Sequence, residues 1–462
     1  MEFVGRELEI NLLNKVYQSN KKGFVLIHGV YGIGKTTLIK EFIKDKKAMY
    51  FHVLALNPLD NLREINKRLF NDENKCSSFK EVFINLSSII KEEKEKIVFI
   101  IDEYYLLETS NKNFKNDLYD FFKNYDGNNL LLLVGLSNMT LAKDLFLKEG
   151  SFFDSLLTEE IRIKPLRFKY AIKSLKGFSE EDILKYLVLC GDYVGDLNLL
   201  NKNLSFKENV LEIFYKRSSI GLDKSFYFEG SGIRTFNLYN SILRAIALGN
   251  VTPVEISNYI NMPLRTITKY LVVLINEGII KKNLINFYHR SAIYYIARPF
   301  LEFYYKFVFE HVHEIKGGIG EEIFNNDYSK IEKYLEERVG KMIVNFLLCK
   351  SRDDVVSFPY IVVETFNKNI DYKQSCIDVI GLFQRNIIFC NCLNYSKEKD
   401  KFDLVNLIRD SNVKSFSGYT KKSYLLFSTI GFSGNLKELE NKNIKLVSYK
   451  ELLNDYIFDW LL

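Results

Sequence analysis

Residues Phe24-Val-Leu-Ile-His-Gly29-Val-Tyr-Gly-Ile-Gly34-Lys-Thr-Thr37 place the pattern G-x-x-x-x-G-K-[ST] between a short apolar run and a segment of helical length. A strand, a glycine-rich turn and a helix in this order form a phosphate-binding loop, because backbone N–H groups and the positive end of the helix dipole converge on an anion. We expect Lys35 to reach the β and γ phosphate oxygens and Thr36 to ligate Mg²⁺. The predicted site for Mg²⁺ and ATP comprises Gly29, Gly32, Ile33, Gly34, Lys35, Thr36 and Thr37.

Two further apolar runs end in polar residues that fit the same site. Lys96-Ile-Val-Phe-Ile-Ile-Asp102-Glu103 ends in an acidic pair, in which Asp102 is predicted to hold Mg²⁺ and Glu103 to orient and deprotonate the attacking water. The run at residues 130–134 leads into Ser137 and Asn138, which are placed to contact the γ-phosphate or that water. For Ser137 and Asn138 the alternative is an ordinary turn at a strand end.

The chain alternates short apolar runs with amphipathic stretches over residues 1–165, a pattern typical of a parallel sheet flanked by helices. Its 462 residues are enough for two to four domains, so we predict an α/β multidomain protein. The expected units are an ATPase core at 1–165, a helical lid at 166–235, a winged helix at 236–298, an aromatic docking helix with a hinge at 299–330 and an α/β domain at 331–462.

Composition excludes several classes of protein. With 47% hydrophobic and 26% charged residues the chain is of ordinary globular type, and no run approaches the ~18 apolar residues of a membrane span. The first residues lack a secretory pattern and six cysteines are too sparse for a disulfide framework, so we expect a cytoplasmic location without membrane association. A net charge of +6 is mild, and any polyanion site must be local.

The predicted winged helix has a well-marked second helix, because Thr252 can cap it, Pro253 suits its first position and Glu255 completes a capping box. The third helix would enter a DNA groove, with the following strands as the wing. Exposed candidates for contact with double-stranded DNA are Arg265, Thr266, Thr268, Lys269, Lys281, Lys282 and Arg290. Winged helices also bind proteins, and that alternative stays open.

The docking helix is predicted from Pro299-Phe-Leu-Glu302-Phe-Tyr-Tyr-Lys306-Phe-Val-Phe-Glu310, where charges recur every four residues on an aromatic helix. Gly317-Gly-Ile-Gly320 is the expected hinge.

Several motifs together resemble the archaeal AAA-type ATPases of the STAND class. They are Phe3-Val-Gly-Arg-Glu-Leu-Glu, the phosphate loop, Ile101-Asp-Glu-Tyr, Glu160-Ile-Arg-Ile-Lys-Pro-Leu and Tyr294-Tyr-Ile-Ala-Arg-Pro-Phe-Leu-Glu-Phe-Tyr-Tyr-Lys-Phe-Val. The resemblance covers nearly the whole chain and implies that Val4, Gly5 and Arg6 lie near the adenine. It also implies that the C-terminal domain is similar to restriction-endonuclease-like nucleases.

Two departures from that family bear on turnover. Ser155-Leu156-Leu157 stands where relatives carry an arginine that acts on the γ-phosphate across a subunit contact. Since an arginine finger is worth about 10³ to 10⁵ in rate, we expect slow or partner-dependent hydrolysis unless Arg162 or Arg167 substitutes. The lid also lacks the family's Gly-Gly-x-Pro turn and has Gly191-Asp-Tyr-Val-Gly195-Asp instead.

The C-terminal domain keeps the aspartate expected of such nucleases as Asp378, but Asn391 and Leu393 replace the usual glutamate and lysine, and Gly340 replaces the helix glutamate beside Glu336 and Glu337. It is therefore predicted not to cut nucleic acid. The sequence favours an ATP-dependent switch acting on DNA, a protein partner or a homo-oligomer. The alternatives are an ATP-regulated nuclease and a nucleotide-binding scaffold without turnover.

Overall fold

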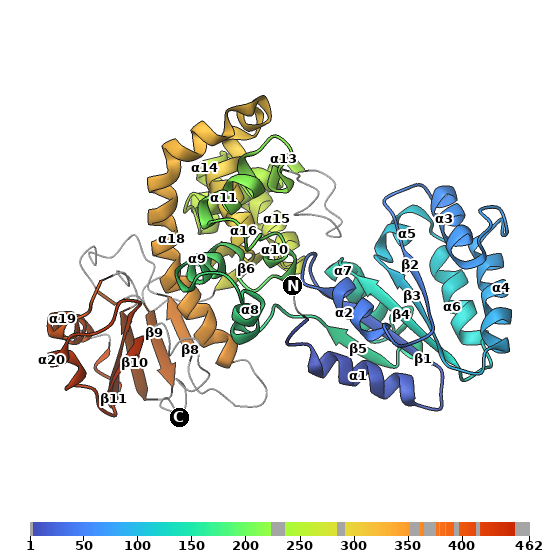
Figure 1. The fold of residues 1–462 in the computed structure, drawn as a ribbon, viewed down its shortest axis with the longest axis horizontal. Helices are drawn as coiled ribbons and strands as arrows, with labels where there is room; N and C mark the ends of the chain where they lie inside the picture. The colour runs from blue at the N-terminus through green and yellow to red at the C-terminus, as the bar shows by residue number, and fades with distance from the viewer. Residues whose placement is uncertain are drawn as a thin grey trace.

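The computed structural model describes residues 3–222, 236–283, 292–351, 361–364, 376–377, 379–383, 385–391, 397–412 and 416–448. Figure 1 shows an N-terminal sheet with its helices at one end of the molecule, a second sheet at the other end, and a helical region between them. None of the helices in these ranges is both long enough and apolar enough to cross a membrane.

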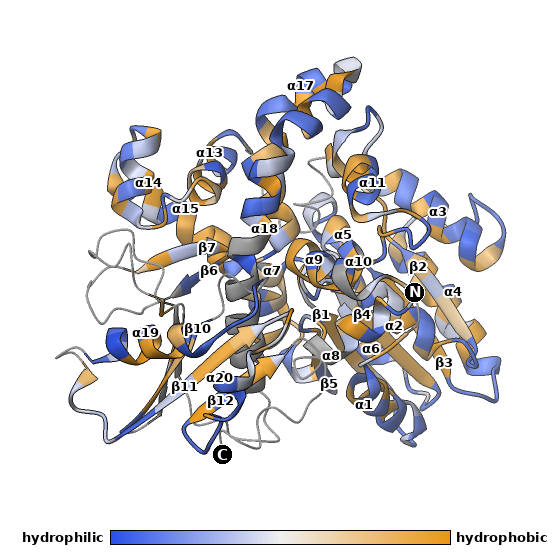
Figure 2. Cartoon of the chain, turned by 60° about the vertical axis from the view of Figure 1, so that its left-hand side comes forward, coloured by the Kyte–Doolittle hydropathy of each residue, from blue (hydrophilic) through white to orange (hydrophobic). Residues whose placement is uncertain are grey.

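The first sheet has five parallel strands in the order β2-β3-β4-β1-β5. Successive residues of a strand face opposite sides, so Phe24 and Leu26 pack on one face of the sheet while Val25 and Ile27 pack on the other. Both faces are covered, which explains why β1, β3 and β4 are buried along their whole length and mainly orange in Figure 2. The strands are β1 (Gly23–His28), β2 (Ala48–His52), β3 (Ile97–Asp102), β4 (Leu130–Leu136) and β5 (Glu159–Arg162).

Helices on the two faces complete the layers. One face packs against α1 (Glu7–Gln18) and α2 (Lys35–Phe42), and the other against α3 (Pro58–Phe70), α4 (Phe79–Glu92) and α6 (Phe114–Asn124). Two short helices follow strand ends, α5 (Tyr105–Ser110) and α7 (Met139–Ala142). The predicted α/β fold with a parallel sheet is confirmed.

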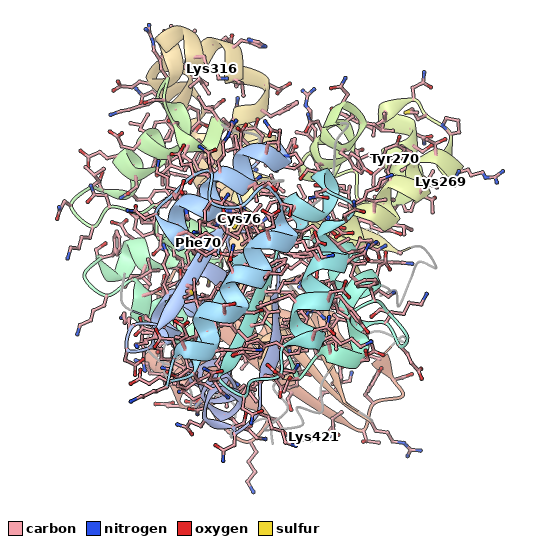
Figure 3. All side chains as sticks on the ribbon, turned by 90° about the vertical axis from the view of Figure 1, so that its right-hand side faces the viewer. Phe70, Cys76, Lys269, Tyr270, Lys316 and Lys421 are labelled. Carbon is pink, nitrogen blue, oxygen red and sulfur yellow. The ribbon has the colours of Figure 1, made fainter. Side chains whose placement is uncertain are left out.

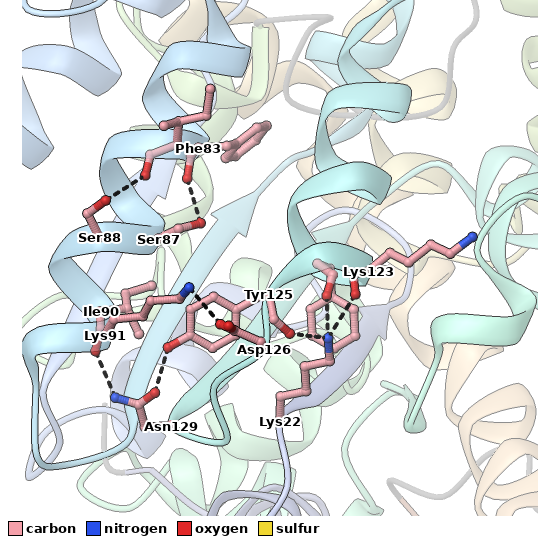
Figure 4. A network of polar contacts seen from close by, with 12 residues as sticks. Lys22, Phe83, Ser87, Ser88, Ile90, Lys91, Lys123, Tyr125, Asp126 and Asn129 are labelled. Carbon is pink, nitrogen blue, oxygen red and sulfur yellow. Dashed lines mark hydrogen bonds and ion pairs between the residues drawn. The ribbon is translucent and has the colours of Figure 1, made fainter.

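A polar network closes the sheet at the edge opposite the phosphate loop (Figure 4). Lys22, just before β1, donates its ammonium to the carbonyl oxygens of Phe122 (2.7 Å), Lys123 (3.2 Å) and Tyr125 (2.5 Å) at the end of α6. Asn129, just before β4, donates to the carbonyl of Ile90 (2.7 Å) in the last turn of α4. These bonds satisfy carbonyls that a helix end leaves unpaired.

We use "helical middle" for the segment that contains α8 (Phe168–Ser174), α9 (Glu180–Cys190), α10 (Val194–Leu197) and α11 (Phe206–Val210). We use "three-helix module" for residues 236–298, which contain α13 (Phe236–Ala247), α14 (Pro253–Ile260), α15 (Leu264–Asn276) and the antiparallel pair β6 (Ile280–Asn283) and β7 (Ile293–Ile296). The predicted start of the second helix is confirmed, because Thr252 and Glu255 form a capping box with Pro253 at the first position.

The predicted docking helix is a chain of short helical pieces starting with α16 (Pro299–Phe303) and a π-helical turn at Tyr304–Val308. Two of its charged residues form ion pairs with other elements: Glu302 is buried and pairs with Arg338 of α18 (Gly320–Ser351), while Glu310 pairs with Arg244. At the expected hinge, Gly318 interrupts the helical path with φ +106°.

The second sheet has the order β12-β11-β10-β9-β8, with β8 (Ile361–Glu364), β9 (Val379–Phe383) and β10 (Asn386–Asn391) antiparallel. β10, β11 (Lys421–Ser428) and β12 (Ile444–Ser448) are parallel. The helices α19 (Lys401–Ser411) and α20 (Gly434–Lys437) accompany them, so the expected α/β character of this part is observed.

Candidate nucleotide site

The carboxyl ends of β1, β3 and β4 meet at one edge of the first sheet, since His28 pairs with Leu136 and Ile101 pairs with Val134. The loop between β1 and α2 lies at this edge. Gly34 caps α2 with φ +104° and Gly32 has φ +77°, a left-handed backbone that favours glycine. The loop therefore has the conformation in which N–H groups and the start of a helix are presented together.

Lys35 is buried, and its side chain is held at the loop. Its ammonium donates to the carbonyl oxygens of Gly29 (2.9 Å) and Val30 (3.4 Å) and lies 4.0 Å from Oε1 of Glu103. This places one positive charge between the loop and the acidic pair.

Asp102 is fully buried at the end of β3. Its Oδ2 accepts hydrogen bonds from Thr36 Oγ1 (2.7 Å) and Tyr50 OH (2.7 Å) and lies 3.5 Å from His52 Nδ1. Burial acts to raise the pKa of Asp102, but the hydrogen bonds from His52, Tyr50 and Thr36 outweigh it, so the pKa lies below its usual value. Asp102 is therefore ionised in the neutral range.

The oxygen donors at this point fit Mg²⁺. Asp102 Oδ1 is buried without a hydrogen-bond partner among the described residues, and the Thr36 hydroxyl lies beside the same carboxylate. A carboxylate and a hydroxyl are ligands that Mg²⁺ accepts alongside water and phosphate oxygens.

Glu103 follows with a left-handed backbone (φ +60°) and a buried side chain. Ser137 Oγ donates to its Oε1 (2.7 Å), while its Oε2 is buried without a partner in the described part of the chain. Burial raises the pKa of Glu103, and the charge of Lys35 opposes this only in part. A carboxylate with a raised pKa and an unpaired oxygen is suited to taking a proton from water.

The neighbouring Asn138 has a different local role. Its side chain accepts from Leu141 N (2.7 Å) and so caps α7. Of the two strand-end residues proposed from the sequence, the structure brings Ser137, through Glu103, into the polar cluster.

Arg6 reaches the loop from the N-terminal segment. Its guanidinium is buried and donates to the carbonyl oxygens of Ile33 (3.2 Å) and Lys164 (2.8 Å). Gly5 next to it packs so closely on Tyr170 that an added Cβ would lie 2.5 Å from the ring. The N-terminal segment is thus fixed beside the loop.

The sequence did not predict three participants. Tyr50 and His52 lie on β2 and reach Asp102 from the neighbouring strand. Side chains at positions 50 and 52 point to the same face of a strand, but this could indicate a contact with Asp102 only if β2 were known to pair with β3. Arg298 contacts the loop region from the end of the three-helix module. Of the arginines named as substitutes, Arg162 is exposed on β5 and Arg167 precedes α8.

The three-helix module presents polar residues on the outer side of α15 and on β6. Arg265, Thr268, Lys269, Lys281 and Lys282 are exposed, Thr266 is half-buried, and Arg290 lies outside the described residues. Figure 3 shows Lys269 projecting away from the rest of the molecule. Val272 and Val273 are exposed on the same helix, so the surface is partly apolar.

In the second sheet, the side chain of Asn391 donates to the Cys376 carbonyl (2.6 Å) and accepts from the buried Lys399 (2.7 Å), a lysine not considered from the sequence. Asp378 and Leu393 lie outside the described residues, as do the side chains of Glu336, Glu337 and Glu364. Among the described residues, no three His, Cys, Asp or Glu side chains gather as metal ligands would.

Comparisons with known proteins give one family match to the first part of the chain and several similarities over more of its length. Residues 3–185 match the family model of an ATPase domain predominantly from Archaea. An uncharacterized protein of Methanocaldococcus jannaschii is 28% identical over 376 residues, covering 78% of this chain and 81% of that protein. The Aeropyrum pernix ORC2 protein, solved as ADPNP–ADP complexes, is 16% identical with a TM-score of 0.47 over 68% of this chain and 95% of that one. A Pyrococcus horikoshii signal transduction ATPase with numerous domains and a tetratricopeptide repeat sensor is 16% identical with a TM-score of 0.31, over 76% of this chain and 46% of that one.

The family match includes the phosphate loop, the acidic pair and Ser137.

Proposed function

We propose that the chain binds ATP at the carboxyl edge of the first sheet and hydrolyses it slowly, and the match of residues 3–185 to the family model of an ATPase domain predominantly from Archaea supports this. One observation carries this proposal. Lys35, at the start of α2, lies beside Asp102 and Glu103 at the end of β3, and Glu103 keeps a buried oxygen with no partner in the described chain. A merely structural carboxylate would be expected to have both oxygens satisfied.

The residues divide the chemistry between them. The loop amides and the Lys35 ammonium bind the phosphates, and Thr36 with Asp102 would hold Mg²⁺, which neutralises charge on the phosphate oxygens when bound. Glu103 takes a proton from the attacking water through Oε2, and Ser137 keeps the carboxylate oriented by occupying Oε1. Tyr50 and His52 hold Asp102 in place and keep it ionised.

We further propose that nucleotide state controls binding of the three-helix module to DNA, with the module acting as a winged helix in a STAND-class switch. Its helix order and antiparallel strand pair suit that use. Both glutamates of the module are engaged internally, Glu255 in a capping box and Glu277 with α7, so the surface of α15 and β6 keeps its positive charge. A protein partner is the other outcome of the binding tests.

Two substitutions test the nucleotide site on the full chain. Lys35→Ala should remove most ATP affinity, because it removes the charge that faces the phosphates, whereas Glu103→Gln should bind ATP as before and lose turnover. Binding is measured by calorimetry with Mg·ATP, and hydrolysis by single-turnover phosphate release. Lys44→Ala, an exposed lysine just after α2, is the matched control and should behave as the unchanged protein. Unaltered ATP affinity in the Lys35 variant would refute the assignment.

A further inference from the structure

Arg298 lies at the junction of three parts of the chain. It precedes α16 directly after β7, and its side chain is buried. The guanidinium forms a bidentate ion pair with Asp196 of α10, with Nε donating to Oδ2 at 2.7 Å and Nη2 to Oδ1. The pair joins the three-helix module to the helical middle.

The same guanidinium lies against the phosphate loop. A Cβ built on Gly32 would be 3.4 Å from Nη2, 3.7 Å from Cζ and 3.8 Å from Nη1 of Arg298. Gly195, next to Asp196, donates its N–H to the Gly32 carbonyl (2.7 Å). Arg298 and Asp196 are thus held against the loop backbone at Gly32. Lys35 bonds to the carbonyl oxygens of Gly29 and Val30 at the start of the same loop.

A second residue of the three-helix module also contacts the phosphate loop. Gly278, which follows α15, packs on the loop residue Val30, so that an added Cβ would lie 2.8 Å from its Cγ1. The three-helix module therefore touches the loop at both Val30 and Gly32, on either side of Tyr31.

The charges near the loop favour a phosphate contact for this arginine. Three buried carboxylates, Asp102, Glu103 and Asp196, lie at or beside the loop, and three buried cations, Arg6, Lys35 and Arg298, match them in number before a nucleotide is bound. A bound triphosphate adds roughly four more negative charges. In a water-poor site a second cation is worth much more than at a surface, and a guanidinium binds phosphate oxygens through parallel N–H groups.

We propose that Arg298 is a phosphate-binding residue supplied in cis, which Asp196 positions beside Gly32 until nucleotide phosphates compete for its N–H groups. The inference rests on the proposed ATP site. It assigns to the three-helix module a direct contact with the nucleotide.

A pair of substitutions separates this role from a structural one. Arg298→Ala and Asp196→Asn break the same ion pair, but only Arg298→Ala removes the guanidinium. We expect Arg298→Ala to weaken Mg·ATP binding at least tenfold or to slow single-turnover hydrolysis about 10²-fold, and Asp196→Asn to bind and hydrolyse ATP within about threefold of the unchanged protein. Arg298→Lys should lie between them, because an ammonium keeps charge but not the paired N–H groups.

The measurements are calorimetric affinities for ATP and ADP, single-turnover hydrolysis and the melting temperature of each full-length variant. Guanidinium ion at low millimolar concentration should partly restore the Arg298→Ala variant. Arg217→Ala, which removes a guanidinium bound to the Gly317 carbonyl, is the control. Equal losses in Arg298→Ala and Asp196→Asn, or normal ATP affinity and turnover in Arg298→Ala, would overturn the inference. If the unchanged protein bound no nucleotide, the proposed function itself would fail.

Discussion

Glu277 accepts hydrogen bonds from Thr140 Oγ1 and, at 3.2 Å, from Met139 N, and so ties the end of α15 to the start of α7. α7 follows β4 directly after Ser137, which bonds to Glu103. The short segment from Ser137 to Thr140 therefore connects the proposed catalytic carboxylate to the three-helix module, with a hydrogen bond at each end.

The Glu277 contact should depend on pH. Burial raises the pKa of Glu277 in the folded chain above its unfolded value, and the hydrogen bonds from Thr140 and Met139 only partly oppose this. Ionisation therefore destabilises the fold, so the contribution of this group to stability is greatest in acid and falls as pH rises through the folded pKa. Thermal unfolding of Glu277→Gln and the unchanged protein at pH 4 to 8 should show the variant gaining relative stability with pH. A constant difference would contradict the assignment.

Tyr50→Phe should destabilise the protein by about 1.5 to 3 kcal/mol at neutral pH, because it removes a hydrogen bond to the buried charge of Asp102. The pKa of Asp102 is lowered in the folded state, so this stabilisation is present above the unfolded pKa and is lost as pH falls. Unfolding at pH 7 and pH 3 should therefore show a large difference that shrinks in acid. Tyr119→Phe, on α6, is the control and should leave both values unchanged.

Lys22→Met should lower stability by about 1 to 3 kcal/mol, since it leaves the carbonyls at the end of α6 without their donor. ATP affinity should stay the same, because Lys22 precedes β1 whereas the phosphate loop follows the other end of that strand. Chemical denaturation and calorimetry on the same sample measure the two quantities. The neighbouring exposed Lys21→Met is the matched control, and equal losses in the two variants would show that general charge is responsible.

The local parts of the site could be predicted from the sequence. The loop from Gly29 to Thr36 is continuous in the chain, and the ends of β3 and β4 lie beside it because parallel strands bring their carboxyl ends to one edge. Those two rules place Lys35, Asp102, Glu103 and Ser137 without any knowledge of tertiary contacts.

The distant parts could not be predicted. Tyr50 depends on β2 lying next to β3, which the sequence does not reveal, and Arg298 meets Gly32 only because the helical middle packs on the core. The four-residue spacing of Glu302, Lys306 and Glu310 also could not show that Glu302 is buried and pairs with Arg338, because the same interval suits an exposed and a buried face. Burial is decided by what packs against a helix, not by the helix alone.

The C-terminal domain should not cleave DNA. Asn391 is a neutral amide whose oxygen already accepts from Lys399, so it is a poor ligand for Mg²⁺, which prefers several oxygen ligands in octahedral geometry. Incubation of the full chain with plasmid and single-stranded DNA in Mg²⁺ or Mn²⁺, with and without ATP, should leave both intact. Cleavage that disappears in Asp378→Ala would show that the domain has a metal site after all.

DNA binding by the three-helix module should show the salt dependence of phosphate contacts. Each neutralised phosphate releases counterions, so log affinity should fall linearly with log salt, by about 0.9 per contact for duplex DNA. Arg265→Ala and Lys281→Ala, which remove exposed charges on α15 and β6, should each flatten the slope by about one unit and weaken binding to all sequences similarly. Lys207→Ala, on α11 outside the module, should leave the slope unchanged.

Fluorescence anisotropy with a labelled duplex at several salt concentrations measures the slopes, in the presence of ATP and of ADP. If low salt reveals no binding in either nucleotide, the exposed Val272 and Val273 beside these charges favour a protein partner, because apolar side chains contribute little to phosphate contacts and much to protein interfaces.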